Sequence, residues 1–199
     1  MTATALGWIG PDWPAPQHVC VLSSLRGGGV SDGPYASLNL AAHVGDRTEA
    51  VAANRLLLRE AARLPAEPLW LEQVHGTVVT RHEGAVSPPP RADAAVTFEP
   101  GRVCAVMTAD CLPVVFADRA GTRVGVAHAG WRGLVGGVLQ ATIAALEVPA
   151  SDLHAWLGPA IGPAAFEVGP EVCEAYLARV AGSAECFTSN DRGRYLADI

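Results

Sequence analysis

Two histidines and one cysteine, His75, Cys111 and His128, stand out because their side chains could share one metal ion. Each closes or follows a short apolar stretch that we expect to form a strand, and strand ends are where functional side chains are usually carried. Two imidazoles and one thiolate form a zinc-binding set that leaves a fourth position for water. Such an ion makes water a nucleophile near neutral pH. The sequence lacks the paired Cys-x-x-Cys motifs of structural zinc sites, which favours a catalytic centre built from separate segments.

Taken one at a time, these residues also have ordinary structural interpretations. A lone cysteine is usually a small apolar packing residue, and a lone histidine is usually a hydrogen-bonded structural group. The metal interpretation depends on the combination, because Asp110 directly precedes Cys111 and a glycine-rich turn, residues 129–133, directly follows His128. Spacing alone leaves both interpretations open.

Charged residues beside the three candidates could move protons and bind anions. Arg132 lies in the turn after His128, where a helix beginning near Leu134 would present free backbone N–H groups to an oxyanion or phosphate. The glycines of this turn could equally serve close packing of helix on sheet. Asp110 and Glu167 could each act as a general acid or base, with a solvated carboxylate as the alternative for Glu167. We predict Asp110, Glu167 and Arg132 as catalytic residues.

A polar, turn-rich segment over residues 31–46 lies upstream, close in sequence to several arginines. It could line a substrate pocket, or it could consist of ordinary turns and a helix cap. The predicted substrate-binding residues are Arg26, Asn39, His43, Arg55 and Gln73.

The composition excludes several other classes of protein. The 199 residues are 50% apolar and 17% charged, which suits one catalytic domain with a full core over residues 1–199. A net charge of −6 without a basic patch argues against nucleic-acid binding. Every basic residue is arginine, so Schiff-base catalysis by lysine is excluded. No apolar run is long enough to cross a membrane, no signal-peptide pattern occurs, and the widely spaced cysteines suit reduced thiols, so we expect a cytoplasmic protein.

The elements that must position these residues follow from hydrophobic periodicity and turn signals. Helices are expected over residues 48–64, 134–146 and 170–180. Strands are expected over residues 18–22, 69–71, 78–80, 94–97, 103–107, 114–117, 123–127 and 153–157. Consecutive strands between residues 69 and 127, with helices mainly outside, predict an α+β fold.

Five motifs, in this order, resemble the YfiH-like family, also described as laccase-domain proteins, multicopper polyphenol oxidoreductases or peptidoglycan editing factors. They are Asn39-Leu40…His43-Val44-Gly45-Asp46, Gln73-Val74-His75-Gly76, Ala109-Asp110-Cys111-Leu112-Pro113-Val114, His128-Ala129-Gly130-Trp131-Arg132-Gly133 and Gly158-Pro159-Ala160-Ile161-Gly162. The resemblance implies a layered α-β-β-α domain with mixed sheets flanked by helices, and it implies His75, Cys111 and His128 as metal ligands. The family continues past Ile199 with another helix and strands, so the chain is short relative to it at the C-terminus.

The resemblance also implies an activity. The expected enzyme is a zinc-dependent purine nucleoside phosphorylase that acts on adenosine, inosine and methylthioadenosine and also deaminates adenosine. Its partners would be a purine nucleoside and phosphate, and a homodimer stays open. The alternatives are copper-dependent phenol oxidation, hydrolysis of cell-wall precursors with Cys111 as ligand or nucleophile, and a non-enzymatic metal-binding module. Six histidines without a His-x-His pair cannot build a three-copper cluster, so any copper chemistry would use a single ion.

Overall fold

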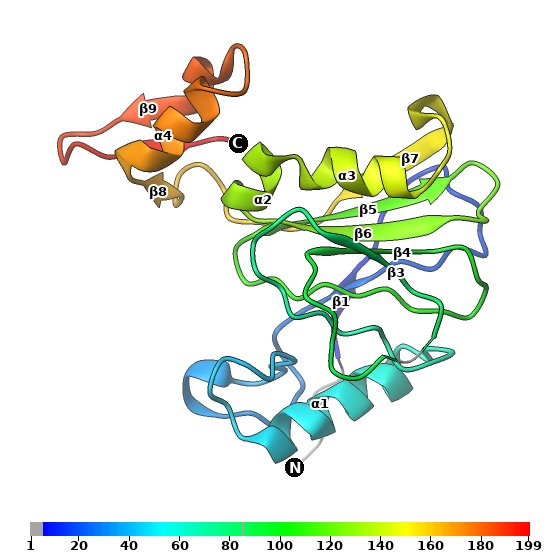
Figure 1. The fold of residues 1–199 in the computed structure, drawn as a ribbon. Coiled ribbons are helices and arrows are strands. Elements are labelled where there is room, and N and C mark those ends of the chain that lie inside the picture. Colours follow the sequence, from blue (N-terminus) through cyan, green and yellow to red (C-terminus); the bar gives the residue numbers. More distant parts are fainter. Residues whose placement is uncertain (1–5, 85) are drawn as a thin grey trace.

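A five-stranded mixed sheet is the central layer of the computed structural model, which describes residues 6–84 and 86–199 (Figure 1). Its strand order is β3-β4-β6-β5-β7. The strands are β3 (Val79–Arg81), β4 (Ala94–Thr97), β5 (Leu112–Asp118), β6 (Val124–Ala129) and β7 (Leu153–Leu157). β3 runs parallel to β4, and the other neighbours are antiparallel. Most of these strands were expected, because their valine-rich runs suit a pleated, buried surface.

Two short helices, α2 (Trp131–Gly136) and α3 (Val138–Ala145), cover one face of the sheet. Val138 and Leu146 from this helical layer are fully buried against Val96 and Val114 of the sheet. A single helix over residues 134–146 was expected and is wrong, because Gly137 adopts a left-handed conformation with φ of 99°. That conformation interrupts the helix and is one that glycine takes at little cost.

The opposite face of the sheet is covered by extended but irregular chain and then by α1 (Thr48–Ala61). Residues 69–71 and 103–107, expected as strands, are instead joined by one isolated parallel bridge between Leu69 and Cys104. They pack against the sheet through Leu69, Leu71 and Ala95. The mixed α/β fold class, with helices flanking mixed sheets, is confirmed.

Helix α1 ends three residues before the predicted boundary. Arg63 takes a left-handed φ of 49°, and the Leu64 N–H donates to the Arg59 carbonyl at 2.9 Å. This is the Schellman arrangement that closes many helices, usually with glycine where arginine stands here. The end is therefore set by chain geometry before Pro65 is reached.

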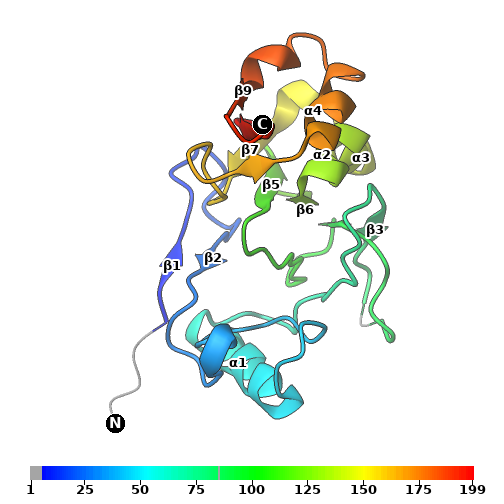
Figure 2. The same cartoon turned by 90° about the vertical axis from the view of Figure 1, so that its left-hand side faces the viewer.

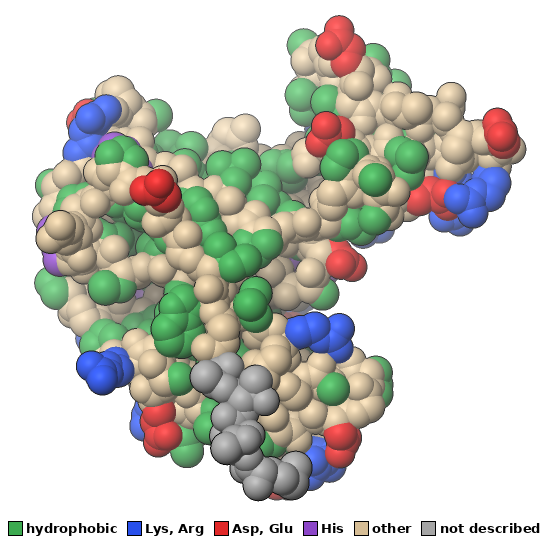
Figure 3. Space-filling model, turned by 180° about the vertical axis from the view of Figure 1, so that it is seen from behind, with side chains coloured by type: hydrophobic (Ala, Val, Ile, Leu, Met, Phe, Trp, Pro, Cys, Tyr) green, Lys and Arg blue, Asp and Glu red, His purple; other side chains and the backbone are tan. Residues whose placement is uncertain are grey.

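A smaller C-terminal unit packs beside α2 and projects from the sheet (Figures 1 and 2). It contains β8 (Glu167–Val168), α4 (Pro170–Leu177), β9 (Phe187–Ser189) and β10 (Tyr195–Ala197), with the antiparallel strand order β8-β10-β9. Its core joins Val172 and Tyr176 to Trp131 and Leu134 of α2. In Figure 3 the surface is hollowed between this unit and the region of α1.

The remaining elements are short. β1 (Trp8–Ile9) pairs with β2 (Ser23–Ser24), so the strand expected over residues 18–22 is wrong. The described residues also form the 3-10 helices η1 (Gly33–Tyr35), η2 (Ala150–Asp152) and η3 (Ser183–Cys186). Among the helices described, none combines the length and apolar character that crossing a bilayer requires.

Candidate metal centre

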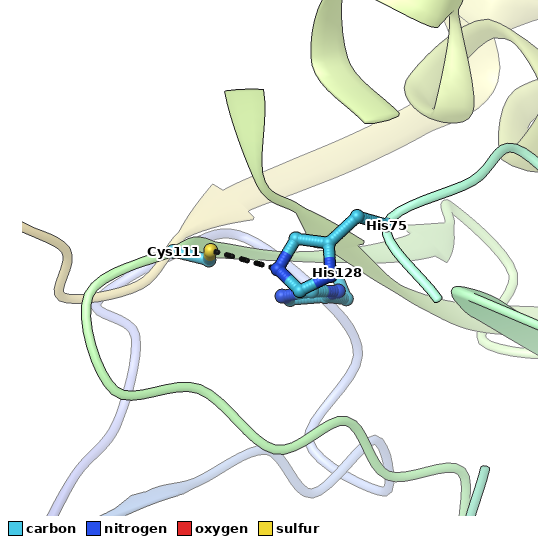
Figure 4. Close-up of side chains that lie close together, drawn as sticks. All are labelled: His75, Cys111 and His128. Carbon is cyan, nitrogen blue, oxygen red and sulfur yellow. Dashed lines mark hydrogen bonds between the residues drawn. The ribbon is translucent and has the colours of Figure 1, made fainter. Parts of the chain in front are cut away.

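His75, Cys111 and His128 converge on one point at the edge of the central sheet (Figure 4). Their potential ligand atoms all lie within 4.8 Å of one another. Cys111 Sγ is 3.9 Å from His75 Nε2, and the two imidazole centroids are 4.7 Å apart at an interplanar angle of 75°. His128 is buried, Cys111 is half-buried and His75 is exposed. One side of the cluster is thus embedded in the fold while the other is open.

Strand register explains why residues so far apart in sequence meet here. In the β5–β6 ladder Leu112 lies opposite Ala129, which places Cys111 just before the start of β5, across from Gly130. His128 and Gly130 are two residues apart on β6 and its extension, so they share one face of the sheet. That face is turned away from α2 and α3, toward the irregular layer that carries His75. The expectation that Cys111 follows a strand over residues 103–107 is wrong, because those residues form only the isolated bridge at Cys104.

The side chains of His75 and Cys111 lie so close to Gly130 that a larger residue at this position would collide with them. A Cβ atom at this position would lie 2.8 Å from His75 Cδ2 and 3.0 Å from Cys111 Sγ. His75 itself has a positive φ of 60°, an uncommon conformation for a residue with a side chain. Both features bring the imidazole and the thiol together at the cost of local backbone freedom.

Asp93 was not among the predicted site residues, yet it contacts both histidines and is completely buried. Its Oδ1 is 2.9 Å from His128 Nδ1 and accepts the His75 N–H at 2.8 Å. Its Oδ2 accepts the Gly76 N–H at 2.6 Å and the Val74 N–H at 3.2 Å. Burial alone would raise the pKa of Asp93, but these hydrogen bonds lower it below its ordinary value. The carboxylate is therefore ionised at neutral pH.

The electrostatics of the cluster suit a cation. Burial lowers the pKa of His128 and the nearby His75 lowers it further, against the opposing effect of Asp93, so the imidazole is neutral and can act as a ligand. Burial, Asp110 and Asp93 raise the pKa of Cys111. Without a positive charge nearby the thiol keeps its proton, whereas a bound cation would compensate these negative neighbours.

The donor set and its spacing also fit zinc. Zinc bonds of about 2.3 Å to sulfur and about 2.0 Å to nitrogen, at tetrahedral angles, place the two ligand atoms about 3.5 Å apart. The Cys111 Sγ to His75 Nε2 distance of 3.9 Å is a few tenths of an ångström longer. Small side-chain rotations would close that difference, so the three residues can hold such an ion.

Comparison with known proteins identifies the family of this chain. Residues 20–199 match the family described as multi-copper polyphenol oxidoreductase laccase. A Pseudomonas aeruginosa protein named purine nucleoside phosphorylase is 53% identical over 193 residues, covering 96% of this chain and 78% of the relative. The Escherichia coli protein named purine nucleoside phosphorylase YfiH is 53% identical over 191 residues, with the same coverage. The chain belongs to the YfiH family.

Solved structures of similar proteins have the YfiH-family fold described above. A Neisseria meningitidis protein of the DUF152 family superposes with a TM-score of 0.90 at 51% identity, covering 96% of this chain and 78% of that chain. A Geobacillus stearothermophilus protein, YlmD, gives a TM-score of 0.78 at 30% identity and covers 88% of this chain and 70% of its own.

Of the three predicted catalytic residues, Asp110 is the one that lies beside the cluster. It is exposed and lines a cavity of about 100 Å³ together with Cys111, Gly130, Trp131 and Phe166. A carboxylate beside an apolar cavity wall and a candidate metal ligand is well placed to exchange protons with a bound molecule.

Arg132 and Glu167 have different surroundings from those expected. The guanidinium of Arg132 lies 4.2 Å from the centroid of the Trp131 ring. Its helix, α2, begins at Trp131 rather than near Leu134 and is 6 residues long, and anion binding at this turn stays a prediction. The carboxylate of Glu167 accepts a hydrogen bond from Asn190 at 2.9 Å and pairs with Arg192. These partners belong to the C-terminal unit, and proton transfer by Glu167 stays a prediction.

Most predicted substrate-binding residues are engaged in folding the segment before α1. Arg26 donates two hydrogen bonds to the Ala36 carbonyl, at 3.0 and 2.7 Å. Asn39 donates to Asp46 at 3.0 Å. The Arg55 guanidinium donates to the Leu40 carbonyl at 3.0 Å and lies 4.0 Å from the centroid of a Trp70 ring. His43 is exposed on this segment. Substrate contact by these four residues stays a prediction.

Gln73 connects the two loops that carry ligands. Its side-chain amide donates to the Met107 carbonyl at 2.8 Å and accepts the Met107 N–H at 2.7 Å. The loop of His75 is thereby fixed to the chain that leads into Cys111. A structural role explains this residue without a substrate, and its predicted contact with substrate also stays a prediction.

Proposed function

We propose that this chain is a zinc-dependent purine nucleoside phosphorylase that cleaves adenosine, inosine and methylthioadenosine, and that it also deaminates adenosine. We further propose that it acts in the cytoplasm on a nucleoside and inorganic phosphate. The observation that carries the proposal is the His75–Cys111–His128 cluster beside a cavity, in a chain 53% identical to proteins named purine nucleoside phosphorylase.

His75, Cys111 and His128 would hold the zinc ion. When bound, the ion supplies a Lewis acid that polarises substrate oxygen or lowers the pKa of water. Asp110, at the cavity wall, would exchange the proton with the purine during deamination or departure of the base. The apolar surface of Trp131 and Phe166 would face the purine ring and exclude water.

Phosphate would be bound by arginine, because the chain contains no lysine. Of the two candidates, Arg132 adjoins the cavity-lining Trp131, whereas Arg55 is committed to the Leu40 carbonyl and to Trp70. Arg132 is therefore the better candidate for phosphate.

Metal content and phosphate dependence test the proposal together. Purified protein should contain one zinc per chain, and Cys111→Ala should contain none and lose activity. Cys104→Ala is the matched control, since this half-buried thiol packs beside Leu69 and Leu71 away from the cluster. Inosine should yield hypoxanthine only when phosphate is present, and adenosine should also yield inosine. Base release that does not depend on phosphate would exclude a phosphorylase.

Single-copper phenol oxidation is the second candidate, favoured by the description of the matched family. A site with two histidines and one cysteine also suits copper. Protein loaded separately with zinc and with copper should be assayed on inosine and on a simple phenol. Phenol oxidation by the copper form, with no nucleoside cleavage by the zinc form, would favour the oxidase over the phosphorylase.

A further inference from the structure

Asp93 is the side chain through which two of the three candidate ligands are connected to each other. It precedes β4, whereas His128 lies on β6 and His75 lies in the loop before β3. It is completely buried, and each of its two oxygens has two hydrogen-bond partners in these segments. A buried carboxyl group needs hydrogen-bond partners, and the partners of Asp93 all lie in the segments that carry His75 and His128.

We propose that Asp93 is a positioning residue of the metal centre: it fixes the ring of His128 with Nε2 free for the ion and holds the loop that presents His75. This inference deepens the proposed function and rests on it for the identity of the ion.

The first part follows from hydrogen-bond chemistry. A carboxylate only accepts hydrogen bonds, so the 2.9 Å contact requires the hydrogen of neutral His128 to be on Nδ1. The lone pair is then on Nε2, the nitrogen on the side of the ring away from Asp93. The His128 N–H also donates to the Asp93 carbonyl at 2.7 Å, which fixes the backbone of the ligand to the same residue. Carboxylates in this position orient ligating histidines and make them more basic.

The second part concerns the loop of His75. Three successive backbone N–H groups, those of Val74, His75 and Gly76, point at the Asp93 carboxylate. The left-handed φ of 60° at His75 costs about 1–2 kcal/mol and needs such compensation. Charge-assisted hydrogen bonds of this kind are stronger than neutral ones. The loop conformation that brings His75 close to Cys111 is therefore held by Asp93.

Asp93→Asn tests positioning because it preserves shape while changing donors and acceptors. If the amide nitrogen replaces Oδ2, the N–H groups of Val74 and Gly76 face a donor. If it replaces Oδ1, the His75 N–H faces a donor and His128 must accept through Nδ1, which puts the ring hydrogen on Nε2 and blocks metal binding. The first orientation disturbs the loop of His75, and the second disturbs both His75 and His128.

Asp118→Asn is the matched control for loss of stability alone. Asp118 is also buried, and its carboxylate accepts from the Thr122 N–H at 2.7 Å, the Thr122 hydroxyl at 2.8 Å and the Arg123 N–H at 2.9 Å. It closes the β5–β6 turn, at the end of β5 opposite Cys111. Both variants change a buried carboxylate that accepts hydrogen bonds from backbone N–H groups, but only Asp93 contacts candidate ligands.

Two measurements on the full chain test whether Asp93 positions the candidate ligands. Zinc affinity, from competition with a chromophoric chelator, should fall about 10–100-fold in Asp93→Asn and stay unchanged in Asp118→Asn. Nitrogen-15 NMR of the histidine rings in the metal-free wild type, assigned with His128→Gln, should show His128 protonated on Nδ1.

Each outcome separates the two proposals. A wild type that binds no zinc would defeat the proposed metal enzyme, whereas the ring spectrum would still test Asp93. A metal-free His128 protonated on Nε2 would overturn the inference even if Asp93→Asn fails to fold. Zinc affinity equal to wild type in a folded Asp93→Asn would overturn it as well and leave the metal site standing.

Discussion

Gly130→Ala is expected to damage the metal centre through a single added methyl group. Gly130 has φ of −65° and ψ of 158°, a conformation that alanine adopts freely. The substitution therefore carries no backbone strain, and reduced freedom of the unfolded chain would by itself add about 0.4–1 kcal/mol of stability. Any damage must come from the contacts of the new Cβ atom.

Those contacts set the size of the effect. The Cβ would lie 2.8 Å from His75 Cδ2, whereas non-bonded carbons prefer about 3.5–4.0 Å, so the imidazole must shift by roughly 0.7 Å or more. Overpacking of this kind costs about 1–3 kcal/mol, which outweighs the gain from the unfolded state. Metal–ligand distances tolerate only about 0.2 Å, so we expect zinc affinity to fall at least about 10-fold.

Competition with a chelator and thermal unfolding with and without zinc measure both effects. Gly27→Ala is the control, because its Cβ would meet nothing within 4 Å and its φ is not positive. The control should bind zinc like wild type, while Gly130→Ala should bind it more weakly and gain less thermal stability from it. If Gly130→Ala matched wild type in both respects, the His75 imidazole could not lie as close as 2.8 Å to the added Cβ, and the argument from Gly130 would fail.

Two further predictions concern the supports of the cluster. Gln73→Met removes both hydrogen bonds to Met107 and leaves its backbone groups without these partners, so the free energy of unfolding should fall by about 1–3 kcal/mol and zinc affinity should fall with it; unchanged urea unfolding would show that this link is dispensable. Burial opposes ionisation of Asp118, but hydrogen bonds from Arg123 and Thr122 prevail and lower its pKa. The unfolded chain therefore binds this proton more readily, so the contribution of Asp118 to stability is present above about pH 4 and is lost as the pH falls through the lowered pKa. Asp118→Asn should accordingly show a shallower loss of urea midpoint on acidification than wild type, and parallel curves for the two proteins would contradict the assignment.

The fold was predictable where local pattern determines the outcome. The strands over residues 94–97 and 153–157 have the bounds found for β4 and β7, because each is a short, mostly apolar run between turns. Residues 69–71 and 103–107 have the same character but form only one bridge. Whether such a run becomes a strand depends on which backbone lies beside it, and that partner is remote in sequence.

The helix expected over residues 134–146 failed for a related reason. Its apolar spacing is helical on both sides of Gly137, and packing on the sheet uses both halves. The left-handed Gly137 separates α2, whose Trp131 and Leu134 pack on the C-terminal unit, from α3, which packs on the sheet. The conformational preference of glycine indicates only that such a turn is possible at this position.

The residues of the candidate site also differ in how far the sequence could predict them. His75, Cys111 and His128 could be selected because imidazole and thiol groups have specific chemistry in distinctive motifs, whereas Asp93 is a single acidic residue in the apolar run Ala92-Asp93-Ala94-Ala95-Val96. An acidic residue within an apolar run was the available signal, and it does not indicate which residues the carboxylate contacts.

Pairing of the strands supplies the partner. Ala94 lies opposite Ala127 in the β4–β6 ladder, which places Asp93 across from His128, just as the β5–β6 ladder places Cys111 across from Gly130. Because side chains alternate between the faces of a sheet, a slip of one residue in either ladder would turn one member of these pairs to the opposite face. Burial of Val96, Val114 and Ala127 against α3 resists that slip, since it would expose them. The hydrophobic core on one face of the sheet thus fixes the position of the candidate metal ligands on the other.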